Sequence, residues 1–203
     1  MNKKALYTLS YGVYFLSARE GEKDNACIIN TAVQVANSPA RVSVAVIKEN
    51  LTCSMIEKTG RFNLSAITKE ADFALFQRFG MRSGRDGDKF DGFADAERTP
   101  NGLYRLSRCS NAWMSLQVVG SMDLGSHVLF IGEVVDADVL SREETCTYDY
   151  YRSDIKDKAP SPAGKKGWRC KVCGYVHEDP VLPEDFICPW CKHGTEDFEY
   201  FEE

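Results

Sequence analysis

The sequence lacks both a long hydrophobic run and an excess of positive charge. No apolar stretch approaches the roughly 18 residues that a membrane-spanning helix requires, so we do not expect a membrane protein. The 25 Lys and Arg residues are outnumbered by 30 Asp and Glu residues, which gives a net charge of −5. Because binding to a phosphate backbone depends on clustered positive charge, nucleic acid is not expected as a partner either.

Internal repeats and low-complexity segments are also missing, and we do not expect an export signal. The N-terminal segment has lysines at positions 3 and 4, but Tyr7, Ser10 and Gly12 interrupt the apolar part that a signal peptide needs. We therefore expect a cytoplasmic protein, in which thiols remain reduced. No glycine fingerprint of the Rossmann type is present either.

The chain has enough apolar residues to form a core, since 43% of its 203 residues are hydrophobic, and this length corresponds to one or two domains. Residues 167–203 contain nine acidic and three basic residues, a local charge of −6. The preceding stretch is polar and contains Pro160, Pro162 and Gly164, which is typical of a linker. We predict one domain over 1–152, a linker over 153–166 and a second domain over 167–203.

The first domain is predicted to be mainly β. Alternating and β-branched patterns predict strands at 11–18, 26–35, 41–47, 61–67, 103–107, 112–121, 128–140 and 147–151. Helical spacing predicts two short helices, at 52–58 and 70–79. Many short strands without regular βαβ alternation are typical of a closed antiparallel barrel.

Four of the eight cysteines form the most specific pattern in the chain. Two C-x2-C pairs, separated by fourteen residues, are formed by Cys170, Cys173, Cys188 and Cys191. Such pairs present four thiolates to one metal ion, and a domain this small needs a metal or another cross-link to fold. Four thiolates suit zinc and iron alike, so the cysteines by themselves leave the metal open.

The residues around these cysteines resemble the two knuckles of the rubredoxins. They read WRCKVCGYV at 168–176 and LPEDFICPWC at 182–191. The resemblance implies one iron held by four cysteines and one-electron transfer. The chain departs from the family at two points. The connection between the two knuckles is shorter, and Lys192 stands where the family usually has glycine. Hydrogen bonds to the sulfurs help to set the reduction potential of the metal centre, so lysine in place of glycine is expected to change that potential.

Three stretches of the first domain stand out, and two of them contain groups that could bind an anion. Asn50 and Thr52 stand at a predicted helix start, where exposed N–H groups bind anions. Arg82, Arg85 and Lys89 lie in a glycine-rich loop whose freed N–H groups could help them bind an anion, and His127 precedes an apolar strand. Taken singly, each has an ordinary structural explanation as a helix cap, a solvated loop or a turn residue.

Together and in this order, the three stretches resemble the flavin reductase-like family, over about residues 5–151. The resemblance implies an FMN-binding split β-barrel followed by a small C-terminal rubredoxin-like metal domain, the combination found in the high-molecular-weight rubredoxins. It also implies which residues contact FMN. They are Asn30, Thr31 and Ala32 at the ring, Lys48, Asn50 and Thr52 at the phosphate and ribityl chain, Arg82, Ser83, Gly84, Lys89 and His127 on the loop side, and Tyr151 over the ring.

The same resemblance implies a homodimer in which NAD(P)H reduces FMN, and electrons pass to the iron and then to a partner such as a flavodiiron protein. FMN and iron carry this chemistry, so no catalytic side chain is expected. One alternative is a flavin or ferric reductase that releases reduced flavin and has a structural zinc tail. Another is a non-redox binding protein whose zinc-loaded tail mediates contacts. The other cysteines are expected to pack as small apolar residues.

Overall fold

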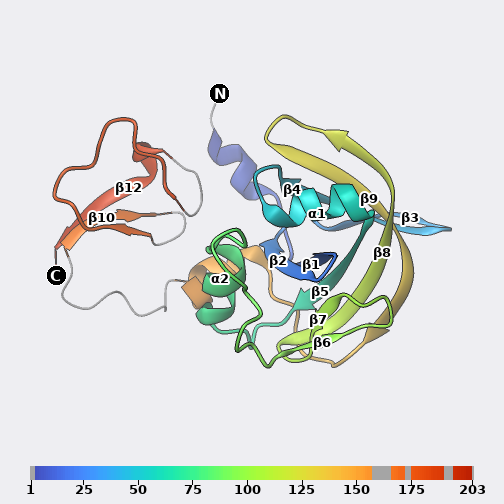
Figure 1. Cartoon of the computed structure of the whole chain (residues 1–203). Coiled ribbons are helices and arrows are strands. Elements are labelled where there is room, and N and C mark those ends of the chain that lie inside the picture. The colour runs from blue at the N-terminus through green and yellow to red at the C-terminus, as the bar shows by residue number, and fades with distance from the viewer. Residues whose placement is uncertain (1–2, 157–165, 172–174, 190–193, 203) are drawn as a thin grey trace. The chain divides into compact units, whose positions relative to one another are not determined.

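The computed structural model describes residues 3–156, 166–171, 175–189 and 194–202 (Figure 1). The chain divides into two compact units, Met1–Ile155 and Lys156–Glu203. Most of the predicted linker, residues 157–165, lies outside the described residues. Within the described part of the chain, no helix has the length and apolar character needed to cross a membrane.

The first unit is built on one seven-stranded antiparallel sheet. From edge to edge its strands are β2 (Lys23–Ile29), β1 (Tyr14–Glu20), β5 (Arg61–Ile67), β8 (Ser110–Asp123), β9 (His127–Val139), β4 (Ala40–Ile47) and β3 (Val33–Asn37). β2 and β3 are consecutive in the chain but form opposite edges of the sheet. Because so short a connection spans little distance, the sheet must coil until its two edges approach each other, as Figure 1 shows. The predicted mainly β barrel is confirmed.

The single strand predicted over 26–35 is wrong, because the structure interrupts it at residues 30–32. The β-branched composition continues through this stretch, but the partner strand changes. Ile28 pairs with Phe15 of β1, whereas Val33 pairs with Ser43 of β4. At the crossing, the Thr31 hydroxyl donates to the Ala45 carbonyl at 2.8 Å and accepts from the Ala45 N–H at 3.1 Å.

Alternate residues of the strands face two different cores. Leu16 of β1 and Val44 of β4 belong to an interior cluster, which α1 (Leu51–Thr59) joins with Met55 and Ile56. Phe15 points the other way, into a second cluster formed with α2 (Phe73–Gly80). This two-residue alternation is what a sheet covered on both faces requires.

Both predicted helices are confirmed, and their caps explain where they begin and end. Asn50 caps α1, which ends at Gly60 in the left-handed conformation (φ 68°). α2 begins at Phe73, later than the predicted residue 70, because the Asp72 carboxylate accepts the N–H of Leu75 at 3.1 Å.

The strand predicted over 147–151 is wrong, because this segment is helical. Thr147 accepts the N–H of Tyr150 through its hydroxyl at 3.2 Å and starts α3 (Tyr148–Tyr150), which continues as the π-helix η2 (Tyr151–Lys156). The aromatic residues that suggested a strand belong to the second core instead. The Tyr148 ring packs on Tyr11, and the Tyr151 ring lies 4.4 Å from Phe76 of α2.

The remaining elements are short. A hairpin of β6 (Ala96–Arg98) and β7 (Tyr104–Leu106) includes the predicted strand at 103–107, and a 3-10 helix, η1 (Lys3–Thr8), precedes the sheet. The second unit has a three-stranded sheet in the order β11 (Val176–His177), β10 (Lys166–Cys170) and β12 (Phe198–Glu202), and a 3-10 helix, η3 (Thr195–Asp197).

Candidate functional site

The turn from β4 into α1 is the first part of the candidate site. The Asn50 side-chain oxygen accepts both the backbone N–H and the hydroxyl of Thr52, each at 3.2 Å. This arrangement caps the helix, and the first N–H groups of a helix have no partner within it. The start of α1 is therefore a place of positive potential next to a polar amide.

Buried polar groups of β2 lie beneath this turn. Asn25 Nδ2 donates to the Thr52 hydroxyl at 2.9 Å, and these residues are only 1% and 0% exposed. Burial raises the pKa of the neighbouring Cys27 thiol, while hydrogen bonds from Thr52 and Asn50 act in the opposite direction. Burial also raises the pKa of Cys53 to about 11. Both thiols are therefore protonated at neutral pH and packed as small apolar groups, as predicted.

The glycine-rich loop after α2 lies against the same turn. Gly84 is buried, and a Cβ atom placed on it would lie 2.2 Å from Asn25 Oδ1, so only glycine fits. Arg85 reaches the carbonyl of Glu49 at 3.5 Å, and its N–H donates to the Ser83 hydroxyl at 3.1 Å. Arg82 and Ser83 are exposed beside this contact.

Lys89 anchors the loop from inside. It is 6% exposed, and its amine donates to the carbonyls of Ala26 and Phe79 at 3.0 and 3.1 Å. Burial lowers the pKa of Lys89; the nearby Arg82 adds to this effect and Cys27 opposes it. Two of its three donors thus bind the fold, and the contact of Lys89 with FMN stays a prediction.

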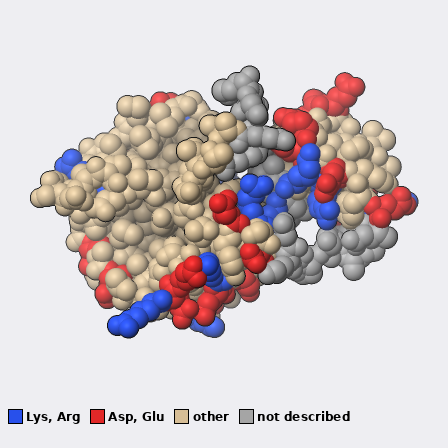
Figure 2. All heavy atoms as spheres, turned by 180° about the vertical axis from the view of Figure 1, so that it is seen from behind, with Lys and Arg blue, Asp and Glu red and all other residues tan. Residues whose placement is uncertain are grey.

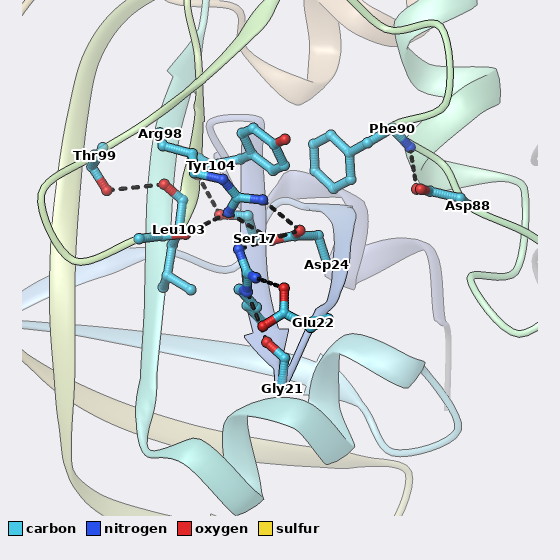
Figure 3. A network of polar contacts seen from close by, with 12 residues as sticks. Ser17, Gly21, Glu22, Asp24, Asp88, Phe90, Arg98, Thr99, Leu103 and Tyr104 are labelled. Atoms are coloured by element: carbon cyan, nitrogen blue, oxygen red, sulfur yellow. Dashed lines mark hydrogen bonds and ion pairs between the residues drawn. The ribbon is translucent and has the colours of Figure 1, made fainter.

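The end of the loop is held by a stack of side chains shown in Figure 3. The Phe90 ring stacks on Tyr104 of β7 at 4.5 Å, and the Arg98 guanidinium lies 4.1 Å from the centre of the Tyr104 ring. Arg98 also binds both carboxylate oxygens of Asp24, at 3.2 and 2.8 Å. The Asp88 carboxylate accepts the N–H of Phe90 at 2.8 Å. The hairpin β6–β7 therefore fixes where the loop ends.

The β8–β9 hairpin meets the turn from the other side. His127 pairs with Ile47, the last residue of β4, and its Nδ1 lies 2.8 Å from the Ser126 hydroxyl. Lys48 forms an ion pair with Asp123 at 2.6 Å, which raises the pKa of this exposed lysine. The Lys48 N–H also donates to the Ser126 carbonyl at 3.1 Å.

The structure thus brings together three stretches that are far apart in the sequence. The β4–α1 turn contacts the loop through Asn25 and Arg85, and it contacts the β8–β9 hairpin through Lys48. Asn30 and Ala32, both half-buried, flank Thr31 at the crossing between the sheet edges. Tyr151, which was also predicted to contact FMN, does not join these residues, because its ring packs in the second core with Phe76 and Tyr148.

Two residues of this arrangement, Asn25 and Asp123, were not predicted. One of them carried a signal in the sequence. Asn25 lies two residues before Cys27 in β2, so the strand period places both side chains on the same buried face. A buried asparagine requires partners, which marks it as a structural or functional residue.

Two of the four metal-pattern cysteines lie among the described residues. Cys170 and Cys188, one from each C-x2-C pair, are 1% and 0% exposed and share a small core with Phe198. Phe186 packs edge-on against Phe198 at 5.4 Å, and Trp168, Tyr175 and Leu182 line the same core. Cys173 and Cys191 lie outside the described residues. Two buried sulfurs, one from each pair, within one small core fit a shared metal ion.

Family comparisons divide the chain into the same two parts. A family model described as flavin reductase like domain matches residues 6–158. A second model, described as rubrerythrin, rubredoxin-like domain, matches residues 168–199.

Individual relatives agree with these matches. The chain is 32% identical to the high molecular weight rubredoxin of Moorella thermoacetica over 98% of its own length and 99% of that protein. It is also 32% identical to a ferric-chelate reductase (NAD(P)H) of Archaeoglobus fulgidus, over 80% of this chain and 96% of that one. An FMN-binding protein of Thermus thermophilus has the same fold, with a TM-score of 0.60 at 23% identity over 66% of this chain and 73% of that one.

Proposed function

The chain belongs to the flavin reductase-like family and has a rubredoxin-like domain at its C-terminal end, and on this premise we propose the route of its electrons. It is an electron-transfer oxidoreductase that uses NAD(P)H and FMN. Electrons pass from NAD(P)H to FMN, from FMN to an iron held by four cysteines, and then to a protein acceptor. The observation that carries this proposal is the presence of both domains in one chain that aligns along nearly its whole length with a high molecular weight rubredoxin.

The flavin is proposed to lie along the β4–α1 turn, with its phosphate at the start of α1 and its ring at the crossing 30–32. When bound, FMN accepts two electrons as hydride and releases them singly, so it links NAD(P)H to a one-electron centre. Asn50, Arg82 and Ser83 supply donors and positive charge for the phosphate. The half-buried residues Asn30 and Ala32 offer backbone groups to the ring.

The metal site is proposed to use Cys170, Cys173, Cys188 and Cys191. Iron in this setting exchanges single electrons. The aromatic core around the two described cysteines keeps their sulfurs away from water, and the backbone N–H of Cys170 donates to the carbonyl of Tyr175 at 2.8 Å, which closes the first knuckle.

The acceptor is proposed to be a flavodiiron protein with a less acidic docking surface. Residues 167–203 carry a charge of −6 before metal is counted, and acidic side chains are prominent on the smaller unit in Figure 2. Charge complementarity of this kind accelerates association and is screened by salt. The rate of acceptor reduction is therefore expected to fall as ionic strength rises, and a rate independent of salt would contradict this docking.

The chain is proposed to act as a homodimer. Figure 2 shows a broad area of the larger unit free of Lys, Arg, Asp and Glu side chains. Several exposed apolar side chains lie on β3, β8 and β9, including Val33, Met122 and Val135 at 58%, 60% and 62% exposure. Such residues on a folded unit favour association with a second copy. Sedimentation of the purified chain tests this, and a monomer at micromolar concentration would contradict it.

The central experiment is an absorption spectrum of the full chain, repeated after anaerobic addition of NADH. We expect flavin bands together with ferric-thiolate absorption, and both should bleach. Flavin bands alone, with zinc in an iron-supplemented sample, would overturn the internal electron route.

A second candidate function is supported by the match to the ferric-chelate reductase, which covers 96% of that protein. In that case, the chain would release reduced flavin. Retention of FMN through dialysis, in both oxidised and reduced states, excludes this route, whereas loss of the flavin on reduction favours it.

A further inference from the structure

We propose that Asn25 is a positioning residue that builds the phosphate end of the flavin site without touching the flavin. This inference rests on the proposed binding of FMN at the β4–α1 turn. Asn25 is 1% exposed, and its amide lies between the start of α1 and the glycine-rich loop. These two segments lie about thirty residues apart in the sequence and have to supply donors to a single anion.

The direction of the hydrogen bonds determines which atoms face the ligand. Asn25 Nδ2 has only protons to give, so at 2.9 Å it donates to the Thr52 hydroxyl oxygen. Thr52 then has one hydroxyl proton left, whose acceptors are Asn50 Oδ1, at 3.2 Å, and the Cys27 sulfur, both inside the protein. The hydroxyl of Thr52, which is 0% exposed, is used entirely inside the protein. Thr52 thereby becomes a second positioning residue and not a direct contact.

Asn50 is oriented by this chain of donors. Its Oδ1 accepts two hydrogen bonds from Thr52, so its Nδ2 points away from the helix backbone. One N–H group of that Nδ2 is used inside the protein by the Cys27 sulfur, and the described part of the chain offers Nδ2 no oxygen acceptor. Asn50 is half-buried, so the second N–H group of Nδ2 is left for a ligand at the start of α1. An anion satisfies this donor, and a group without acceptor oxygens does not.

The other side of the Asn25 amide holds the loop. Asn25 Oδ1 approaches Gly84 so closely that a Cβ atom there would lie 2.2 Å away. The exposed Arg82 and Ser83 immediately precede this glycine, so the contact sets their distance from Asn50. Because both segments rest on one buried amide, their donors converge on one anion. The ligand chemistry that fits is a phosphate monoester, with two negative charges and three acceptor oxygens.

The test compares FMN with riboflavin, which has the same ring and ribityl chain but no phosphate. Dissociation constants of the full chain for both flavins are measured by fluorescence quenching. In Asn25→Ala we expect the FMN dissociation constant to rise at least about tenfold, the equivalent of one lost charge-assisted hydrogen bond, while that of riboflavin changes less than about twofold. Gly84→Ala is expected to give the same pattern, because its methyl group displaces the loop.

Asn63→Ala is the matched control. Asn63 is also 1% exposed, and its amide bonds Thr99, Asn101, Ser115 and the backbone carbonyl of Tyr104, none of which contacts Asn25. Its loss is expected to lower stability and leave the ratio of the two dissociation constants unchanged. Thr52→Val and Thr52→Ser form a second pair for the case that Asn25→Ala does not fold, and the serine variant should keep more of the FMN preference.

Two outcomes would overturn the inference, and they are distinguishable. If Asn25→Ala and Thr52→Val weaken FMN and riboflavin equally while the unmodified chain prefers FMN, then Asn25 is only structural and the proposed FMN site stands. If the unmodified chain has no preference for FMN over riboflavin, the proposed phosphate site is itself wrong.

Discussion

At the scale of single residues, the site depends on polar groups that the fold has buried. Lys89 is the clearest case, since a lysine that is 6% exposed is held by two backbone carbonyls and lies close to Cys27 and Arg82. Such a residue is costly to bury unless its donors are satisfied. Its position fixes the loop against β2 and α2.

The burial of Lys89 predicts a pH dependence of stability. Its pKa in the folded state is lowered from the ordinary value of 10.5, so between these two values the unfolded chain binds more protons than the folded one. The free energy of unfolding is therefore expected to rise with pH in that interval. Urea unfolding at pH 8 and pH 10 should show that the free energy of unfolding of the original chain rises relative to that of Lys89→Met. If the difference between these two chains is the same at both pH values, the prediction is wrong. Repeating both measurements in a Cys27→Ala background removes the neighbouring thiol.

Asn50 offers a substitution that separates helix capping from ligand binding. Aspartate caps a helix as well as asparagine does, so Asn50→Asp should change the free energy of unfolding by less than about 0.5 kcal/mol. The new carboxylate removes the amide donors and repels phosphate, so FMN binding should weaken at least about tenfold. Asn50→Ala is the control, since it loses the cap and should cost about 1 kcal/mol. Unchanged FMN affinity in Asn50→Asp would contradict the role of the amide.

At the scale of elements, short segments fix the loop that carries Arg82 and Ser83. The small β6–β7 hairpin contributes Arg98 and Tyr104, which hold Phe90 at the end of that loop (Figure 3). β6 was not predicted, because a three-residue strand leaves almost no period to detect. Its role emerges only from the contacts it makes.

Tyr104→Ala is expected to lower the free energy of unfolding by about 2 kcal/mol, since it removes the Phe90 stack and the contact with the Arg98 guanidinium. It should also weaken FMN binding by loosening the loop. Tyr104→Phe keeps the ring and serves as the control, with little change in either quantity. Chemical denaturation and flavin titration of both variants provide the measurement. Equal losses in the two variants would point to the hydroxyl instead of the ring.

At the scale of the whole molecule, the two units have separate cores. The clusters of the first unit contain no residue beyond Ile155 among those described, and the second unit packs around Cys170, Cys188 and Phe198. The cofactors are therefore expected to be lost independently.

Cys188→Ser should abolish iron binding and leave FMN in place. Cys188 is 0% exposed at the centre of the small core, and loss of one of four thiolates breaks a tetrahedral site. Absorption spectra and metal analysis measure both cofactors. Cys109→Ser, a change at a half-buried cysteine of the first unit, is the control and should retain both. Loss of FMN in Cys188→Ser would show that the units do not hold their cofactors separately.

Much of the fold was available from local patterns. Helix α1 was predictable because Asn50 and Gly60 mark its ends and its apolar residues follow the helical period. The segment 147–151 was mispredicted because aromatic residues are typical of strands, whereas here the Thr147 cap and the packing of Tyr151 on Phe76 decide for a helix. The break at 30–32 was missed because it depends on a change of partner strand, which leaves no local pattern.

The sequence by itself determined which motifs the protein carries: four cysteines spaced for one metal, and three stretches that together resemble the flavin reductase-like family and thereby imply a flavin. Motifs of this kind are local, so they can be read without a fold. Only the tertiary structure decided how those stretches meet, because Asn25 joins Thr52 to Gly84 across segments distant in the sequence. It also decided that Lys89 and Thr52 use their polar groups inside the protein, since burial and hydrogen-bond direction arise only when the strands pack.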